Sequence, residues 1–352
     1  MNPAPLPPLP IPGPGAHWPT GAWETGPQLS GDPDRLAELL DPVFAVESTP
    51  ELGVSLALVA VQGGRIVAER YGPGVGPDDT LLSWSMAKSV TQAALGILVG
   101  DGLLDPDAPA PVPEWSGADD ERGRITVRDL LRMRSGLRFV EDYVDDTVSD
   151  CLEMLWGAGA EDVAAYAASL PLEHPVGSTF SYSSGTTNIL SRILGDVVAG
   201  GTGRGNREQT EAFLHERLLG PIGMDSATPR FDAAGTWVGS SYLYATATDF
   251  ARFGLCYLRG GRWGVDGIVP SDWVDDARTP RSVDPELGWG YGEHWWVRGD
   301  ELGTFWANGY DGQATICVPE LDLVVVRLGR TPAELRDHRE RFLASVIDCF
   351  RD

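Results

Sequence analysis

The stretch Ser83-Trp84-Ser85-Met86-Ala87-Lys88-Ser89-Val90 decides the fold, and it contains the only lysine of a 352-residue chain whose other 26 of 27 basic side chains are arginines. Residues 84–99 are apolar almost all round, as in a helix buried on every side, and Gly100-Asp101-Gly102 ends it. In such a helix Ser85 and Lys88 lie on one face, one turn apart. A buried lysine can lose its proton and act as a base, whereas arginine cannot. The spacing therefore predicts a serine nucleophile with a lysine base, although a lysine can also follow a serine by accident.

Length and composition limit the class of protein. The chain is long enough for a large core and two domains, and its 42% hydrophobic and 22% charged residues are ordinary for a globular protein. A net charge of −24 argues against nucleic acid or an anionic membrane as a partner. Residues 1–30 are rich in Pro and Gly and contain neither a basic start nor a long apolar run. We expect no signal peptide or membrane anchor, and a cytoplasmic location; no pattern indicates an oligomeric state.

The cysteines carry no metal or redox pattern. All four are widely spaced, without a CxxC pair, and each is flanked by apolar residues, which predicts buried free thiols. They are Cys151, Cys256, Cys317 and Cys349.

The two ends of the chain predict a sheet. A helix is expected from about Asp32, with Ser30 or Asp32 as its cap, followed by strands at 54–61 and 65–71 joined by a tight turn. Toward the C-terminus a helix at 246–258 precedes short strands, and a helix at 335–350 closes the chain. The strands are expected around 291–297 and at 304–308, 315–318 and 323–328.

The middle of the chain is mainly helical. Helical periodicity recurs in five segments, of which the first begins with a capping-box pattern of Thr126 and Asp129. The segments are 125–133, 148–156, 160–170, 187–198 and 209–219. The glycine-rich residues 200–205 are interpreted as a loop, because a phosphate-binding loop would need a strand before it and a lysine after it.

This order predicts an α/β (α+β) fold with an antiparallel sheet, flanked by helices and built from both termini. Residues 31–84 and 236–352 are assigned to the sheet domain, and residues 85–235 to an inserted, mainly helical domain. Residues 1–30 are expected to run extended over the surface, held there by Trp18 and Trp23.

A second candidate motif is Phe180-Ser181-Tyr182-Ser183-Ser184-Gly185, just before the helix expected from Thr187. A tyrosine among small polar residues on a loop can face a cleft. A phenol near an ammonium can be pushed toward the phenolate, and can then exchange protons with a serine or a leaving group. On its own, Tyr182 is better explained as a residue that packs a turn.

A third candidate motif is Trp306-Ala307-Asn308-Gly309-Tyr310-Asp311-Gly312-Gln313, at the end of an expected strand. Gly309 lets a substrate backbone approach, and the backbone amide of Tyr310 could point inward. On its own, the motif would be a hairpin turn.

Other hydrolytic chemistries lack a pattern. No serine has glycine two residues before and two residues after it, and the five histidines show no HExxH spacing. Each histidine is interpreted as a surface or packing residue, with a catalytic role still open for His174 and His294. We expect no metal and no cofactor.

The three motifs, in this order, resemble the serine beta-lactamase and penicillin-binding-protein superfamily, which carries a Ser-x-x-Lys signature. Three further stretches are similar to shared segments of its class C-like members, and the resemblance covers about residues 35 to 350. They are 125–137, 175–183 and 244–254. The branch it most resembles contains class C-like esterases and amide hydrolases, including enzymes that cut 6-aminohexanoate oligomers.

The resemblance implies a role for each motif. Ser85 would be the nucleophile and Lys88 its base, while Tyr182 would hand a proton to the leaving group and activate the deacylating water. The backbone amides of Ser85 and Tyr310 would form the oxyanion hole. We expect three further residues to contact the substrate. They are Ser184, Asn308 and Gly309.

Two departures from the family pattern bear on the substrate. Ser184 stands where the second motif often has asparagine, and Ala307 stands where the third often has lysine or histidine. That basic residue helps to bind the carboxylate of beta-lactams and peptidoglycan stems. A neutral or cationic ester or amide therefore fits better, unless an arginine from elsewhere substitutes.

The leading hypothesis is a serine hydrolase that cleaves small esters or amides through an acyl-enzyme on Ser85. The alternatives are a beta-lactamase or D-Ala-D-Ala peptidase, and a non-catalytic binding module on the same fold. The acyl and leaving groups depend on the loops 139–147 and 288–296, whose aromatic residues could line the cleft or fill the core. These are Tyr143, Trp289, Tyr291, Trp295 and Trp296.

Overall fold

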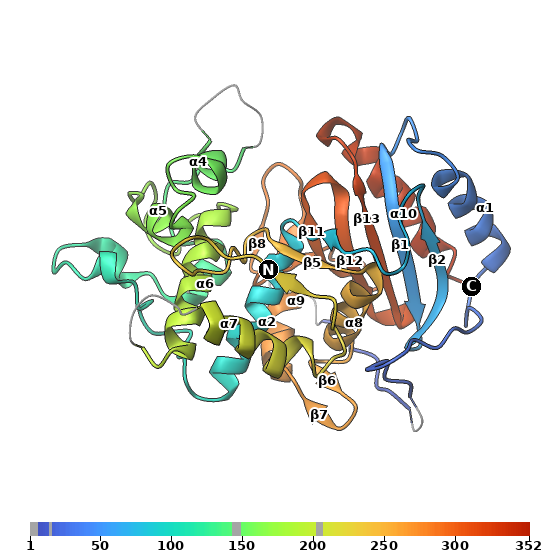
Figure 1. Ribbon diagram of the computed structural model, residues 1–352, viewed down its shortest axis with the longest axis horizontal. Helices are drawn as coiled ribbons and strands as arrows, with labels where there is room; N and C mark the ends of the chain where they lie inside the picture. Colours follow the sequence, from blue (N-terminus) through green and yellow to red (C-terminus); the bar gives the residue numbers. More distant parts are fainter. Residues whose placement is uncertain (1–5, 14–15, 143–148, 202–206) are drawn as a thin grey trace.

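The computed structural model describes residues 6–13, 16–142, 149–201 and 207–352, and its centre is an eight-stranded sheet (Figure 1). The strand order is β2-β1-β13-β12-β11-β10-β9-β8, and every neighbouring pair is antiparallel. The strands are β1 (Val54–Gln62), β2 (Arg65–Tyr71), β8 (Ser282–Val283), β9 (Gly290–Tyr291), β10 (Trp296–Val297), β11 (Phe305–Gly309), β12 (Gln313–Val318) and β13 (Leu323–Arg330). Because β1 pairs with β13, the two ends of the chain build one sheet, which confirms the predicted architecture.

Helices cover both faces of this sheet. Helices α1 (Pro33–Phe44) and α10 (Arg336–Asp348) pack on one face, and α2 (Met86–Gly100) and α8 (Ala247–Leu258) pack on the other (Figure 1). Asp32 caps α1 by accepting the N–H of Arg35. Successive residues of β13 point alternately into two apolar clusters, so the strand reads as a continuous apolar run rather than as an alternation.

The helices from the middle of the chain gather around α2 (Figure 1). They are α3 (Val127–Leu131), α4 (Asp150–Trp156), α5 (Val163–Ser169), α6 (Ser184–Val198), α7 (Arg207–Leu214) and a π-helical turn at His215–Leu219. Helix α2 is buried from Met86 to Leu98, as its all-round apolar sequence predicts. The capping box of Thr126 and Asp129 is present at the start of α3.

The sequence did not indicate several short elements. One is a three-stranded sheet of β3 (Leu81–Leu82), β5 (Leu243–Ala245) and β4 (Thr228–Pro229), in which β3 lies just before α2 in the chain. The others are the hairpin of β6 (Arg262–Trp263) and β7 (Asp266–Gly267), and helix α9 (Ser271–Arg278).

The N-terminal segment is held to the body by its tryptophans, as expected. Trp18 packs edge-on against Trp263, with 5.6 Å between ring centroids, and the Arg252 guanidinium lies 5.1 Å from the ring centroid of Trp23. All four cysteines are buried free thiols. Among the described residues, no helix is both long and apolar enough to cross a membrane. Most of the loop assigned to 200–205 lies outside the described residues.

Candidate active site

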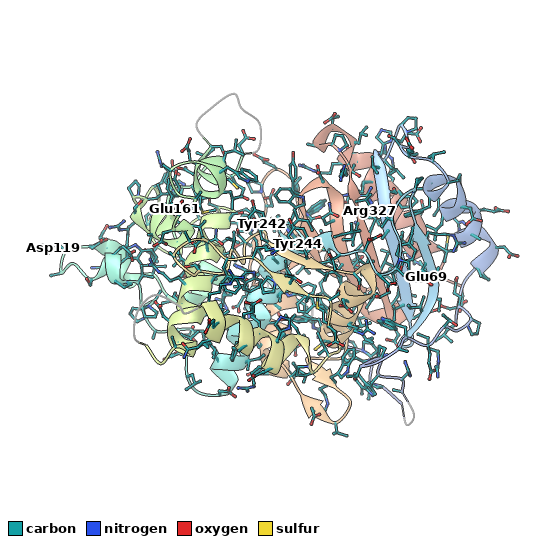
Figure 2. The ribbon with its side chains drawn as sticks, viewed as in Figure 1. Glu69, Asp119, Glu161, Tyr242, Tyr244 and Arg327 are labelled. Carbon is teal, nitrogen blue, oxygen red and sulfur yellow. The ribbon has the colours of Figure 1, made fainter. Side chains whose placement is uncertain are left out.

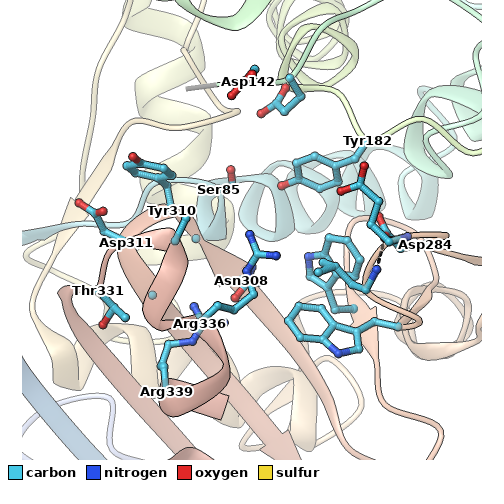
Figure 3. A pocket seen from close by; sticks show the side chains of 18 of the residues that line it. Ser85, Asp142, Tyr182, Asp284, Asn308, Tyr310, Asp311, Thr331, Arg336 and Arg339 are labelled. Carbon is cyan, nitrogen blue, oxygen red and sulfur yellow. Dashed lines mark hydrogen bonds between the residues drawn. The ribbon is translucent and has the colours of Figure 1, made fainter. Parts of the chain in front are cut away.

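A sharp turn at the start of α2 presents Ser85. The N–H of Ser83 donates to the Leu243 carbonyl at 2.9 Å, which fixes the chain against β5. Trp84 then adopts a left-handed backbone conformation with φ of 45°, and the helix begins one residue after Ser85. Ser85 is 9% exposed and opens onto a pocket of about 670 Å³ (Figure 3).

Lys88 is buried directly beneath Ser85. Its Nζ lies 2.9 Å from Ser85 Oγ, 2.9 Å from Ser184 Oγ and 3.0 Å from the Ser240 carbonyl oxygen. Asn188 Oδ1 accepts the N–H of Ser240 at 3.2 Å, which holds that carbonyl in place. Burial lowers the pKa of Lys88 and so favours loss of its proton, while the charge of Glu141 opposes this effect.

Ser184 is not on the pocket wall, where a substrate contact would place it. Its side chain is fully buried because α6 begins at Ser184 itself, three residues earlier than expected, with Ser183 as the cap. The Ser184 hydroxyl lies 2.6 Å from Glu141 Oε1, and the Ser184 N–H donates to Glu141 Oε2 at 2.6 Å. The sequence indicated the loop 139–147 but not Glu141 itself. Its contact with Ser184 joins residues 43 positions apart in the chain, which no local pattern shows.

The contacts of Lys88 decide where its proton-accepting lone pair points. A neutral amine has two hydrogens and one lone pair. The Ser240 carbonyl can only accept a hydrogen bond, and the Ser184 hydroxyl gives its hydrogen to the Glu141 carboxylate. In the neutral form of Lys88 both amine hydrogens are therefore held by these two oxygens, and the lone pair faces the hydroxyl of Ser85. This arrangement can take a proton from Ser85.

Tyr182 completes the group around Ser85. Its ring centroid lies 5.0 Å from Lys88 Nζ, and it stacks on Trp296 at 5.5 Å. Burial raises the pKa of Tyr182, the charge of Glu141 raises it further, and the hydrogen bond with Ser85 opposes both. The expectation that an ammonium pushes this phenol toward the phenolate is therefore wrong, because burial has the larger effect and keeps Tyr182 neutral.

The end of β11 forms the opposite side of the site. Asn308, Gly309 and Tyr310 all line the pocket, and Ser85 lies between Tyr310 and Tyr182 in Figure 3. A Cβ on Gly309 would come within 2.5 Å of the Ser83 carbonyl oxygen. Only glycine therefore lets β11 approach the turn before Ser85 this closely.

The rest of the pocket combines aromatic and charged walls. The aromatic and apolar wall consists of Phe139, Phe180, Leu287, Trp289 and Trp296. Five carboxylates line the pocket, and two arginines of α10 lie near Asn308 (Figure 3). These charged residues are Glu141, Asp142, Asp284, Glu286, Asp311, Arg336 and Arg339.

Two questions left open by the sequence are answered by this wall. Of the aromatic residues considered, Trp289 and Trp296 line the pocket, Tyr291 and Trp295 are buried in the core, and Tyr143 lies outside the described residues. Ala307 is buried and does not reach the pocket, whereas Arg336 does, so an arginine from elsewhere is present.

Neither histidine in question contacts Ser85. His294 is fully buried between Thr187 Oγ1 at 2.9 Å and the Leu131 carbonyl at 2.8 Å, and burial lowers its pKa to about 3. His174 is 41% exposed and lies beside Glu173. Within the described ranges, no group of three His, Cys, Asp or Glu side chains is placed to hold a metal ion.

Comparisons with known proteins identify the family of this chain. The sequence model of the family described as Beta-lactamase matches residues 49–346. A 6-aminohexanoate-dimer hydrolase of Paenarthrobacter ureafaciens is 27% identical over 368 residues, which cover 92% of this chain and 91% of the relative.

Two solved structures share the fold. A Bacillus anthracis protein provisionally described as a 6-aminohexanoate-dimer hydrolase has a TM-score of 0.73 at 21% identity, over 93% of this chain and 87% of its own. A family VIII carboxylesterase has a TM-score of 0.68 at 14% identity, over 93% of this chain and 98% of its own. Since the family match spans most of the sequence, the chain is a hydrolase that belongs to the beta-lactamase family, within the serine hydrolase superfamily.

Proposed function

We propose that this protein hydrolyses small amides or esters through an acyl-enzyme on Ser85, with Lys88 as the base. The observation that carries the proposal is the buried Lys88 amine, 2.9 Å from Ser85 Oγ, whose two other contacts are acceptors. A neutral buried amine with its lone pair toward a serine hydroxyl is suited to activate that serine as a nucleophile.

Acylation follows from this arrangement. Ser85 Oγ attacks the substrate carbonyl carbon while its proton passes to Lys88 Nζ. The negative charge that develops on the carbonyl oxygen is held by the backbone N–H groups of Ser85 and Tyr310, an arrangement worth about 3 to 4 kcal/mol per donor in comparable sites. The C–N or C–O bond to the leaving group then breaks and leaves the acyl group on Ser85.

Tyr182 carries protons between these steps. As a neutral phenol in contact with Ser85, it donates its proton to the departing nitrogen or oxygen and regains one from Lys88. In deacylation a water molecule gives one proton to the same pair while its oxygen attacks the acyl carbon. The bond between that carbon and Ser85 Oγ then breaks, Ser85 Oγ takes the proton back from the pair, and the carboxylic acid is released. The lowered pKa of Lys88 and the raised pKa of Tyr182 support this exchange.

The pocket supports a substrate class. An apolar chain fits against Trp289 and Trp296, and the five carboxylates that line the same pocket favour a substrate that also carries a cationic group. A linear amide with an ammonium end combines both features, in line with the amide substrate in the name of the Paenarthrobacter relative. A cytoplasmic location stays a prediction from the sequence.

The test combines covalent labelling with turnover. We expect a fluorophosphonate to add once to the intact protein, at Ser85, and short p-nitrophenyl esters to be hydrolysed. Ser85→Ala should abolish both with the fold intact, whereas Ser181→Ala, a matched serine of the same pocket, should keep both. Lys88→Arg should lower kcat by ~100-fold or more, because arginine keeps the charge but cannot act as a base.

Three results would contradict the proposal. Turnover that persists in Ser85→Ala would exclude this nucleophile, and near-normal rates in Lys88→Arg would make Lys88 an electrostatic partner only. Inertness of the wild-type protein toward every acylating probe would favour the binding-module alternative.

One observation favours a second candidate, hydrolysis of a substrate that carries a carboxylate, as beta-lactams do. The Arg336 guanidinium lines the pocket and has no ion-pair partner within the described part of the chain. Intact-protein mass after incubation with a penicillin distinguishes the two candidates. A stable or transient adduct on Ser85 would support the carboxylate-bearing substrate, and its absence beside ester turnover would exclude it.

A further inference from the structure

Arg327, in the middle of the strand β13, is a fully buried arginine that the reaction described above does not use. Its side chain is 1% exposed and lies over the central sheet in Figure 2. Among the described residues no carboxylate approaches it within ion-pair distance. A buried charge without a paired carboxylate has a large desolvation cost, so its presence calls for an explanation.

The hydrogen bonds of Arg327 converge on the turn that follows Tyr310. Its Nη1 donates to the carbonyl oxygens of Asp311 at 3.2 Å and Gly312 at 3.0 Å. Its Nη2 reaches two carbonyl oxygens before and at the start of β1, those of Leu52 and Val54, each at 3.4 Å. One guanidinium therefore joins the Tyr310 turn to the edge of the neighbouring strand.

The surrounding chain is shaped to admit this guanidinium. A Cβ on Gly312 would lie 2.6 Å from Arg327 Nη1, and a Cβ on Gly329 would lie 2.5 Å from Arg327 Cζ. Both positions are glycines, so the guanidinium packs directly on their backbone. The site is built for this side chain.

A second buried side chain holds the same turn. Gln313 Nε2 donates to the Tyr310 carbonyl at 3.0 Å, and the N–H of Thr331 donates to the Asp311 carbonyl at 2.8 Å. Figure 3 shows Tyr310, Asp311 and Thr331 together on one side of the pocket. With Arg327, the carbonyls of all three residues of the turn, 310 to 312, are bound by groups from β12 and β13 or from the residue that follows β13.

We propose that Arg327 is a positioning residue for the oxyanion hole: it fixes the Tyr310–Gly312 turn so that the Tyr310 N–H points at the developing oxyanion. Its charge also lies directly behind that turn. Oriented donors and fixed charge stabilise a transition state only when they are held in place before the reaction, which is what a buried, five-donor guanidinium can do. This inference rests on the proposed function, which assigns the Tyr310 amide to the oxyanion hole.

The test compares two arginines of one strand. Arg327→Lys keeps a basic side chain but removes the fork of donors, and the exposed Arg330 at the end of β13 gives the matched control Arg330→Lys. With a p-nitrophenyl ester, we expect kcat of Arg327→Lys to fall by ~10- to 100-fold with KM changed less than ~3-fold, part of the effect of losing one oxyanion donor. The affinity for phenylboronic acid, which forms a tetrahedral adduct with a serine, should fall by a similar factor.

Rates are expressed per active site titrated with fluorophosphonate, so that loss of folded protein does not count as loss of kcat. If Arg327→Lys does not fold, Gln313→Met releases the Tyr310 carbonyl from the other side and should give the same kcat and boronate signature. Identical kinetics in Arg327→Lys and Arg330→Lys, beside normal wild-type turnover, would overturn this inference alone. Wild-type protein without Ser85-dependent turnover would overturn the proposed function and this inference together.

Discussion

Glu141 contributes to the candidate site in a way that the three sequence motifs do not predict. It lies outside the three motifs, yet its two carboxylate oxygens bind the N–H and the hydroxyl of Ser184. Through that hydroxyl it determines which oxygens take the hydrogens of Lys88. Its charge also raises the pKa of Lys88 against the larger effect of burial, which lowers it. One carboxylate therefore influences both the direction and the basicity of the proposed base.

Glu141→Gln tests the effect of the Glu141 charge on the pKa of Lys88. The amide keeps a hydrogen-bond acceptor for Ser184 but removes the charge, so the pKa of Lys88 should fall further. Because Lys88 must be neutral to act, kcat/KM rises with pH through its pKa, and the acidic limb of the profile should move to lower pH in the variant. The measurement is kcat/KM for a p-nitrophenyl ester from pH 4 to pH 8, with Asp142→Asn as the control from the same wall.

An acidic limb that stays in place in Glu141→Gln would show that this charge does not act on the ionising base. A limb that moves equally in Asp142→Asn would assign the shift to the general field of the acidic wall.

Among the elements, those with a strong local pattern were predictable and those that depend on distant partners were not. Helix α2 is apolar on every side, and Thr126 and Asp129 form the capping box of α3, so both helices follow from local sequence. Strands β3 and β5 have two and three residues, and only their pairing within the three-stranded sheet that includes β4 defines them. Helix α6 begins earlier than expected because Ser183, not a later residue, caps it.

The same division holds for the candidate site. Spacing alone brings Ser85 and Lys88 together, since both lie on one turn of helix. The contacts of Lys88 with Ser240 and of Glu141 with Ser184 span 152 and 43 residues. The hydrophobic periodicity of a single element cannot predict such contacts, because they form only when separate elements pack together.

Gly309 has no side chain, and this allows β11 to pack closely against the turn before α2. Its φ of −130° is open to any residue, so the constraint is steric alone. In Gly309→Ala the new Cβ would meet the Ser83 carbonyl, and β11 must move away from Ser85. We expect kcat to fall by ~10- to 100-fold, as for a small misplacement of catalytic groups, with a stability loss of about 1 to 3 kcal/mol.

Steady-state kinetics and urea unfolding measure the two effects. The control is Gly267→Ala in the β6–β7 hairpin, where no atom lies within 4 Å of the added Cβ. Wild-type rates in Gly309→Ala would mean that β11 can yield at this point without disturbing the site.

Over the whole molecule, the segment between β9 and β10 ties the sheet to the helices around α2. Glu293 is fully buried, and its Oε1 accepts from Arg128 and Arg132 at 2.9 Å each. The next residue, His294, accepts from Ser89 of α2 through its carbonyl at 2.7 Å. A polar cluster in the core thus replaces apolar packing where the two parts of the chain meet, and it is sensitive to protonation.

His294 makes the stability of the fold depend on pH. Its Nδ1 faces the Leu131 carbonyl, which can only accept, so Nδ1 carries the hydrogen and Nε2 accepts from Thr187. Burial lowers the pKa of this neutral imidazole to about 3, against 6.5 for the ordinary value. Between pH 3 and pH 6.5 the imidazole therefore binds a proton in the unfolded chain but not in the folded chain. Stability from this group is complete above pH 6.5 and is lost as the pH falls toward 3.

Between pH 7 and pH 5 this linkage predicts a loss of about 2 kcal/mol in the free energy of unfolding from His294 alone. His294→Asn removes the titrating group and keeps a residue that tolerates the positive φ of 58° at this position. Urea unfolding at the two pH values should show a pH-dependent loss that is smaller in the variant by about that amount. His338→Asn, at an exposed position of α10, should lose as much as the wild type. Equal losses in wild type and His294→Asn would mean that the folded protein accepts a proton at His294, and would contradict this prediction.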